Sequence, residues 1–171
     1  MVKTVASFTA QLVKFETTLS YAEVTARLEA EVSKSASQNI ISRIQEVGHQ
    51  NELVSLVNSV TKGKDFLYFM QIPYSGVMEL LEGIKKPTVV VYTIGNPLFA
   101  QQIMKYNPFA AYSIPPRFLV LEKPDVSGTI VAYHLPSSVM SIPGVNDPAL
   151  QAEVEALDMR VEQLVEKVTA V

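Results

Sequence analysis

The stretch from residue 88 to residue 134 constrains the fold more than any other part of the chain. It begins with Thr88–Ile94, a mostly β-branched run that is typical of a buried strand. Gly95-Asn96-Pro97 can end that strand and start a helix, because asparagine caps helices and proline suits their first turn. Arg117–Lys123 and Thr129–His134 then predict two strands joined by a tight turn that contains Pro, Asp and Gly. This order of strand, helix and hairpin predicts an antiparallel sheet.

Helical patterns lie on both sides of this stretch in the sequence. Ser20 and Glu23 form a capping box at the start of a helix over residues 20–34. Asn146-Asp147-Pro148 opens a second helix, in which apolar residues recur at alternating steps of four and three. At 1.5 Å per residue its ~22 residues span roughly 33 Å, enough to cross a whole sheet. The remaining predicted segments are a strand over 4–16, two short helices within 35–63 that Ser35 and Asn51 cap, a strand over 66–72 and one or two helical turns over 77–84.

We therefore expect an α+β fold in which helices, including a long C-terminal helix, pack on a largely antiparallel sheet. The chain has 171 residues, of which 48% are hydrophobic, so it can bury one core. No internal repeat or linker divides it, and we predict one domain over residues 1–171. The segment 35–63 is predicted to be a helical insertion in that domain.

Composition excludes several classes of function. A net charge of −3 argues against non-specific nucleic-acid binding, which requires an excess of Lys and Arg. The chain has no cysteine, so thiolate catalysis, disulfides and Cys-ligated metal sites are ruled out. We also expect no cofactor and no metal, since Gly-rich nucleotide motifs are missing and the two histidines are isolated. No run approaches the ~20 apolar residues of a membrane span, and the first residues do not resemble a signal peptide; we expect a cytoplasmic protein.

The order and spacing of these motifs carry a family resemblance. The segment Ile94-Gly95-Asn96-Pro97, its helix, and Ile114-Pro115 leading into Arg117–Glu122 resemble the family catalogued as domain of unknown function 302. The next strand, Thr129–Tyr133, followed by a Pro-containing loop and the long final helix, continues the pattern. The resemblance is strongest over residues 88–170.

The resemblance implies a compact α+β fold related to the TATA-binding-protein-like class. It also implies a frequent homodimer and no settled biochemical activity. Many members of the family have a cysteine after the Leu-Pro that leads into the hairpin, whereas this chain has Pro116. A thiol-dependent role is therefore not expected to carry over.

Six polar or aromatic residues near the strand ends are candidates for binding a small molecule. An arginine can hold a carboxylate or phosphate through two hydrogen bonds, and a buried tyrosine hydroxyl requires a partner. The alternatives are that the tyrosines pack in the core, that the asparagine is a helix cap, that the arginine is solvated, and that the histidine is a half-exposed strand-end residue bonded to backbone. The candidate ligand-binding residues are Tyr92, Asn96, Tyr112, Arg117, Tyr133 and His134. The segment 35–63 and the loop Pro136–Asn146 are candidate covers.

Three classes of function follow from these features. The leading interpretation is a non-catalytic small-ligand-binding or assembly module that forms a homodimer. The alternative is an enzyme of small-molecule metabolism, in which His134 is the general acid or base and Tyr133 or Arg117 stabilises an anion. The third is a structural interaction protein that buries the acidic row Asp158, Glu162 and Glu166 against a partner. No Gly-x-Ser-x-Gly motif supports a nucleophilic hydrolase.

Overall fold

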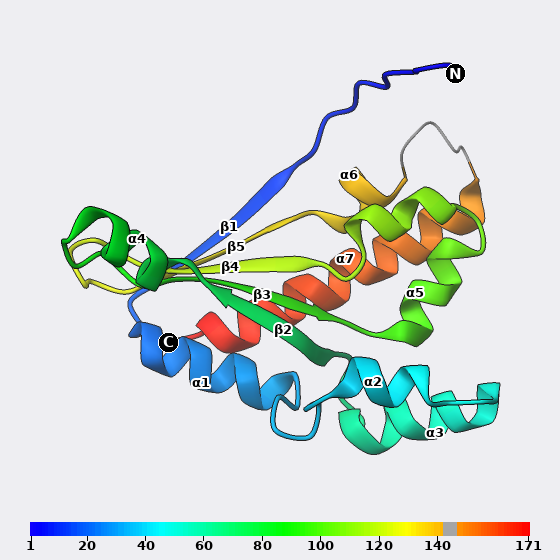
Figure 1. The fold of residues 1–171 in the computed structure, drawn as a ribbon, viewed down its shortest axis with the longest axis horizontal. Coiled ribbons are helices and arrows are strands. Elements are labelled where there is room, and N and C mark those ends of the chain that lie inside the picture. Colours follow the sequence, from blue (N-terminus) through cyan, green and yellow to red (C-terminus); the bar gives the residue numbers. More distant parts are fainter. Residues whose placement is uncertain (142–146) are drawn as a thin grey trace.

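A five-stranded sheet with helices around it makes up the fold (Figure 1), in a computed structural model that describes residues 1–141 and 147–171. The strand order is β1-β5-β4-β3-β2, and every neighbouring pair is antiparallel. The strands are β1 (Leu12–Thr17), β2 (Leu67–Pro73), β3 (Val89–Gly95), β4 (Arg117–Glu122) and β5 (Thr129–His134). The predicted α+β class with an antiparallel sheet is confirmed.

Two helices, α1 (Tyr21–Glu31) and α7 (Pro148–Thr169), pack on one face of the sheet (Figure 1). The other helices lie at the edges and ends of the sheet. These are α2 (Ile40–Gln45), α3 (Gln50–Thr61), α4 (Tyr74–Glu82), α5 (Pro97–Met104), the 3-10 helix η1 (Pro108–Ser113) and α6 (Pro136–Met140). No helix of the described residues has both the length and the apolar character needed to cross a bilayer.

Local sequence signals explain where α1 and α7 start. The Ser20 hydroxyl accepts a hydrogen bond from the Glu23 N–H at 3.2 Å, which satisfies a free donor of the first turn. The Asp147 carboxylate does the same for α7, accepting from the Ala149 N–H at 2.8 Å. The periodic apolar row of α7 is wholly buried: Leu150, Val154, Leu157, Val161, Leu164 and Val168. That row is therefore part of the core of a single chain.

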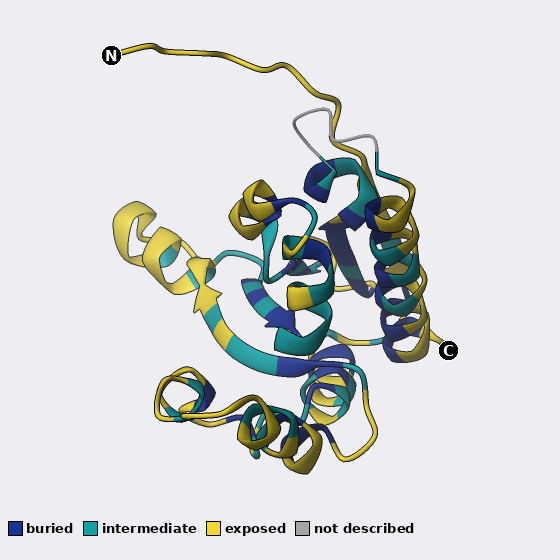
Figure 2. Ribbon diagram, turned by 90° about the vertical axis from the view of Figure 1, so that its right-hand side faces the viewer, coloured by how far each residue is buried: buried dark blue, intermediate teal, exposed yellow. Residues whose placement is uncertain are grey.

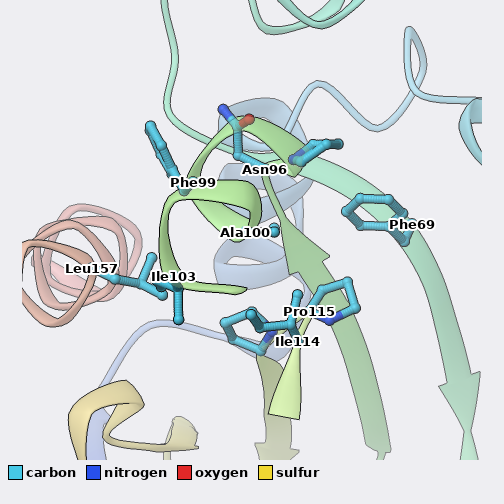
Figure 3. A pocket seen from close by; sticks show the side chains of 11 residues that line it. Phe69, Asn96, Phe99, Ala100, Ile103, Ile114, Pro115 and Leu157 are labelled. Atoms are coloured by element: carbon cyan, nitrogen blue, oxygen red, sulfur yellow. The ribbon is translucent and has the colours of Figure 1, made fainter. Parts of the chain in front are cut away.

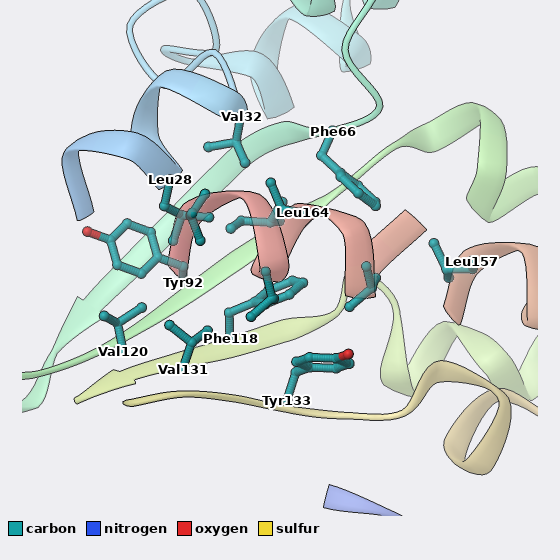
Figure 4. Close-up of a cluster of buried hydrophobic side chains, with 14 of the residues drawn as sticks. Leu28, Val32, Phe66, Tyr92, Phe118, Val120, Val131, Tyr133, Leu157 and Leu164 are labelled. Atoms are coloured by element: carbon teal, nitrogen blue, oxygen red, sulfur yellow. The ribbon is translucent and has the colours of Figure 1, made fainter. Parts of the chain in front are cut away.

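The core lies between this helical layer and the sheet (Figure 4). Alternate residues of β3, β4 and β5 point into it, among them Tyr92, Phe118 and Tyr133. Leu28 of α1 and Leu164 of α7 pack against them from the helical side. Each large side chain that is fully buried contributes roughly 1.5–3 kcal/mol relative to exposure, so this face of the sheet holds the domain together.

A smaller cluster joins α2 and α3 to the outer strand β2. Its buried members are Ile40, Val57, Val60 and Leu67. The Tyr68 N–H donates to the carbonyl oxygen of Val32 at 3.0 Å, so the chain between α1 and α2 closes part of the free edge of β2. The predicted helical segment 35–63 thus packs beside the sheet at its β2 edge.

Several local predictions were wrong. The first strand begins at Leu12, and residues 4–10 are exposed and extend away from the sheet (Figure 1). Asn39, in the left-handed conformation with φ 55°, precedes α2 in place of the predicted Ser35 cap. His49 rather than Asn51 precedes α3. Asn146, predicted to help open the last helix, lies outside the described residues, and η1 and α6 were not predicted.

Candidate functional site: the open face of the sheet

The face of the sheet opposite α1 and α7 carries apolar side chains in rows across the strands. Val91 of β3 is paired with Leu119 of β4, and Leu119 is paired with Ala132 of β5. On the outer strand, Ile72 continues this row. A parallel row contains Val89, Leu121 and Ile130. We call these two rows, together with the residues at the strand ends beside them, the open face.

Charged and polar residues border the open face. At the β1 edge, the Lys14 ammonium lies 2.8 Å from the Glu16 carboxylate, and the Lys123 ammonium lies 3.2 Å from the other Glu16 oxygen. These two contacts hold the pKa of Glu16 below its usual range. At one end of the strands stand Arg117 and His134, which are both exposed. The open face therefore has an apolar centre and a polar border.

Two hollows meet at Arg117 and His134. The first, of about 230 Å³, lies on the open face over Val91, Leu119 and Ala132. The second, a crevice of about 190 Å³, runs between η1 and α6. Its lining residues are Tyr112, Ser113, Pro116, Arg117, His134, Val139 and Met140. Arg117 and His134 stand one residue beyond the Phe118–Tyr133 pair on neighbouring strands, and they line both hollows.

Side-chain hydrogen bonds fix the walls of the crevice. The buried Asn107 amide donates to the Met140 carbonyl oxygen at 2.9 Å and accepts from the Phe109 N–H at 3.2 Å. The Ser113 hydroxyl donates to the Val139 carbonyl oxygen at 3.4 Å. These bonds tie η1 to α6, so the crevice is part of the folded chain and needs no rearrangement to form.

The electrostatics of the two hollows favour an anion. No Asp or Glu is among the described residues that line them. Within the described parts of the chain, eight ion pairs occur, and none contains Arg117. An arginine side chain keeps its positive charge and offers a planar pair of donors. The Arg117 end of the open face is thus a cationic end of an otherwise apolar surface.

Tyr92 and Tyr133 lie on the opposite face of the sheet, in the core. The Tyr92 hydroxyl donates to the Glu29 carboxylate at 2.9 Å, and that carboxylate also contacts the Lys34 ammonium at 2.6 Å. Burial and the Glu29 carboxylate raise the pKa of Tyr92 above its usual range. Tyr133 packs on Phe118, and burial, together with nearby acidic groups of α7, raises its pKa to about 12. Tyr133 borders the open-face hollow, but the strand register turns its ring away.

Asn96 is committed to local structure. Its side-chain oxygen accepts from the Leu98 N–H at 2.9 Å, and its amide donates to the Asp65 carbonyl oxygen at 2.8 Å. It borders a separate, largely apolar pocket of about 50 Å³ between α5, β2 and α7 (Figure 3). Gly95 is required here, because a Cβ atom on it would lie 2.9 Å from the Pro115 Cβ. Asn96 thus serves as the helix cap of α5.

Three of the six predicted residues come together, since Tyr112, Arg117 and His134 line the crevice. The Tyr112 side chain is 97% exposed at its mouth. Tyr133 borders the adjoining hollow, whereas Tyr92 and Asn96 lie elsewhere. Ser113 was not predicted, and Val139 and Met140 were predicted only as part of the candidate cover Pro136–Asn146, because η1 and α6 were themselves not predicted.

The two predicted cover segments take different positions. No residue of 35–63 lines either hollow, because that segment packs at the β2 edge. The loop Pro136–Asn146 contributes α6 to the crevice wall, and its residues 142–146 lie outside the described residues. Among the residues that the structure describes, no three His, Asp or Glu side chains gather as a metal site.

These features define an α+β domain with one bare sheet face and a cationic crevice at its end. The chain belongs to the family described as Domain of unknown function DUF302, whose model matches residues 43–168. It is similar in structure to an uncharacterized conserved protein DUF302 from Bacillus stearothermophilus, with a TM-score of 0.64 and 14% identity. That likeness covers 92% of this chain and 97% of the other, and at this identity it concerns the fold alone. No curated protein matches the sequence.

Proposed function

We propose that this chain is a non-catalytic assembly module that forms a homodimer through the open face, with a small-molecule site in the crevice at the Arg117 end. The observation that carries the proposal is the uncovered apolar rows. An antiparallel sheet that faces water on one side normally alternates apolar and polar residues. In β3 the outward residues Val89 and Val91 are as apolar as the inward ones, which is typical of a face that another surface covers.

A second copy of the chain fits this face better than an unrelated partner. An apolar centre inside a charged border is the usual anatomy of a protein–protein interface. Cyclic dimers, in which the same patch meets itself, are the commonest oligomers. Two such sheets would pack about 10 Å apart, with the apolar rows of each filling the space between them.

The area of the open face supports an interface that reaches beyond the sheet. Five strands at about 4.8 Å spacing and about 20 Å length give a footprint of roughly 480 Å². A standard interface buries about 800 Å² on each partner, so the sheet supplies just over half of it. Helix α4 has no buried residue and stands apart from α1 and α7 (Figure 2). Its Leu80 and Leu81, 87% and 81% exposed, offer further apolar surface beside β2.

The geometry favours this role over the enzyme alternative. A general acid or base works best when a neighbouring group orients it, commonly a carboxylate for histidine. Among the described residues, no carboxylate lines either hollow at His134. We therefore assign His134 to the border of the binding surface.

Native mass spectrometry of wild type and of Leu119→Lys tests the proposal. We expect wild type to appear at twice the mass of one chain and Leu119→Lys to appear as a monomer, because the lysine would place a charge at the centre of the interface. Met159→Lys is the matched control, since Met159 is 59% exposed on α7, far from the open face. A monomeric wild type, or a Leu119→Lys variant that stays dimeric, would refute the interface.

A further inference from the structure

We infer that the crevice between η1 and α6 binds a small carboxylate that carries an apolar group, such as a short acyl chain or a single aromatic ring. This inference rests on the proposed ligand site and names the chemical class of its ligand. It depends on the crevice of one chain, so the oligomeric state does not decide it.

The positive end of the crevice selects the anionic group. Arg117 is the first residue of β4, and His134 is the last residue of the neighbouring strand β5. The two side chains therefore line the crevice at the same end of the sheet. Its planar pair of N–H groups matches the two oxygens of a carboxylate. The hydroxyl of Tyr112, also in the lining, is an additional hydrogen-bond donor. Since the described lining contains no acidic residue, a bound carboxylate meets no competing anion.

The interior of the crevice selects the apolar group. Pro116, Val139 and Met140 form its floor and are all buried in the fold. Methionine adapts its shape to irregular apolar partners, which suits a chain or a ring. A cavity of about 150 Å³ accommodates benzene, so the crevice of about 190 Å³ has room for one ring or a short chain. A large or fully polar anion would leave this floor uncovered.

The position of the crevice restricts how a ligand can extend. Arg117 and His134 also border the hollow over Val91 and Leu119, so the cationic group lies between two apolar surfaces. A carboxylate held by Arg117 can therefore direct its apolar part into the crevice while leaving the open face free. The ligand and a second copy of the chain can then be accommodated together.

Heteronuclear NMR titration with benzoate tests the inference, with benzamide as the neutral probe of the same shape. We expect benzoate to shift the backbone amides of η1, α6 and the start of β4, with a Kd of about 1 mM, as suits a ligand of this size. Benzamide should bind at least about ten-fold more weakly, because it cannot form the charge-assisted pair with Arg117.

Variants locate the interaction. Arg117→Gln should weaken benzoate binding at least about ten-fold by removing the paired charge. Arg43→Gln should leave it unchanged, since Arg43 in α2 lines neither hollow and is likewise absent from the ion pairs of the described residues.

Three outcomes would overturn the inference. Equal shifts by benzamide and benzoate would show that the crevice binds ligands without selecting carboxylates, which leaves the proposed site in place but removes the ligand class. Shifts confined to residues outside the crevice, or no shift at about 10 mM benzoate, ~10 times the expected Kd, would overturn the site as well. None of these results bears on the homodimer, which the mass measurement tests separately.

Discussion

Removing the Tyr92 hydroxyl should destabilise the fold without affecting assembly. Tyr92 is buried, and its hydroxyl donates to the Glu29 carboxylate at 2.9 Å. A hydrogen bond to a charged group contributes about 1.5–3 kcal/mol. The Glu29 side chain is 34% exposed, so water can replace part of the lost bond and the lower end of that range applies. We expect Tyr92→Phe to lower the free energy of unfolding by about 1.5 kcal/mol.

Urea denaturation followed by circular dichroism measures this loss. With a slope of roughly 2 kcal/mol/M, the midpoint should fall by about 0.7 M while the slope stays the same. Tyr112→Phe removes the same atom from a side chain that is 97% exposed, and it should change stability by less than about 0.5 kcal/mol. If the two variants lose equal stability, the Tyr92–Glu29 bond does not support the fold.

The pH dependence gives a second signature of the same bond. The folded chain raises the pKa of Tyr92 above its usual value, so the folded state keeps the phenol proton where the unfolded state releases it. Stability contributed by this group is therefore complete below about pH 10 and decreases at higher pH. The difference between wild type and Tyr92→Phe should become smaller above about pH 10, and a constant difference up to about pH 11 would contradict this assignment.

Two further substitutions test features of the backbone and of the acidic helix. Gly128→Ala should cost at least about 2 kcal/mol in a urea titration, because φ is 151° there and the new Cβ would lie 2.0 Å from the Thr17 carbonyl oxygen. Gly76→Ala is its control, because no atom lies within 4 Å of a Cβ at that helical position, and it should gain about 0.5–1 kcal/mol of stability. Equal effects at both glycines would contradict the close contact between Gly128 and Thr17. Burial, with a contribution from Glu162, raises the pKa of Asp158, so its charge disfavours the folded state above the usual aspartate pKa. Asp158→Asn keeps an acceptor oxygen and should be about 0.5 kcal/mol more stable than wild type at pH 7, with a smaller gain at pH 4. An unchanged or lower stability at pH 7 would show that the Asp158 charge does not destabilise the fold.

The elements predicted well are those with strong local signals. The Ser20–Glu23 capping box, the apolar period of α7 and the Pro-Asp-Gly turn before β5 each depend on residues close together in sequence. These signals predicted α1 and α7, the two helices that pack on the sheet, and the hairpin. The entry into α2 lacks such a signal, because Asn39 precedes the helix in a left-handed conformation and makes no side-chain cap hydrogen bond.

The candidate site shows a limit of a different kind. Tyr133 and His134 are consecutive residues of a strand, as are Arg117 and Phe118, so each pair must point to opposite faces. Strand alternation therefore separates Tyr133 from Arg117 and His134, and it could have been applied to the sequence alone. Strand alternation could not predict that one face of the sheet is uncovered. In β3, Val89, Val90 and Val91 are all apolar, so the sequence does not distinguish the buried face from the open one.

The contact between Tyr68 and Val32 has a consequence for how the chain behaves when it is concentrated. An unpaired strand edge is a template for endless addition of further strands, which leads to fibrils. Here the Tyr68 N–H is already occupied by the Val32 carbonyl oxygen, and the other outer strand, β1, carries Lys14 and Glu16. Growth in the plane of the sheet is hindered at both ends, whereas the face-to-face dimer that we propose would be complete after one partner. Concentrated preparations should therefore stop at a particle of defined size and should not polymerise.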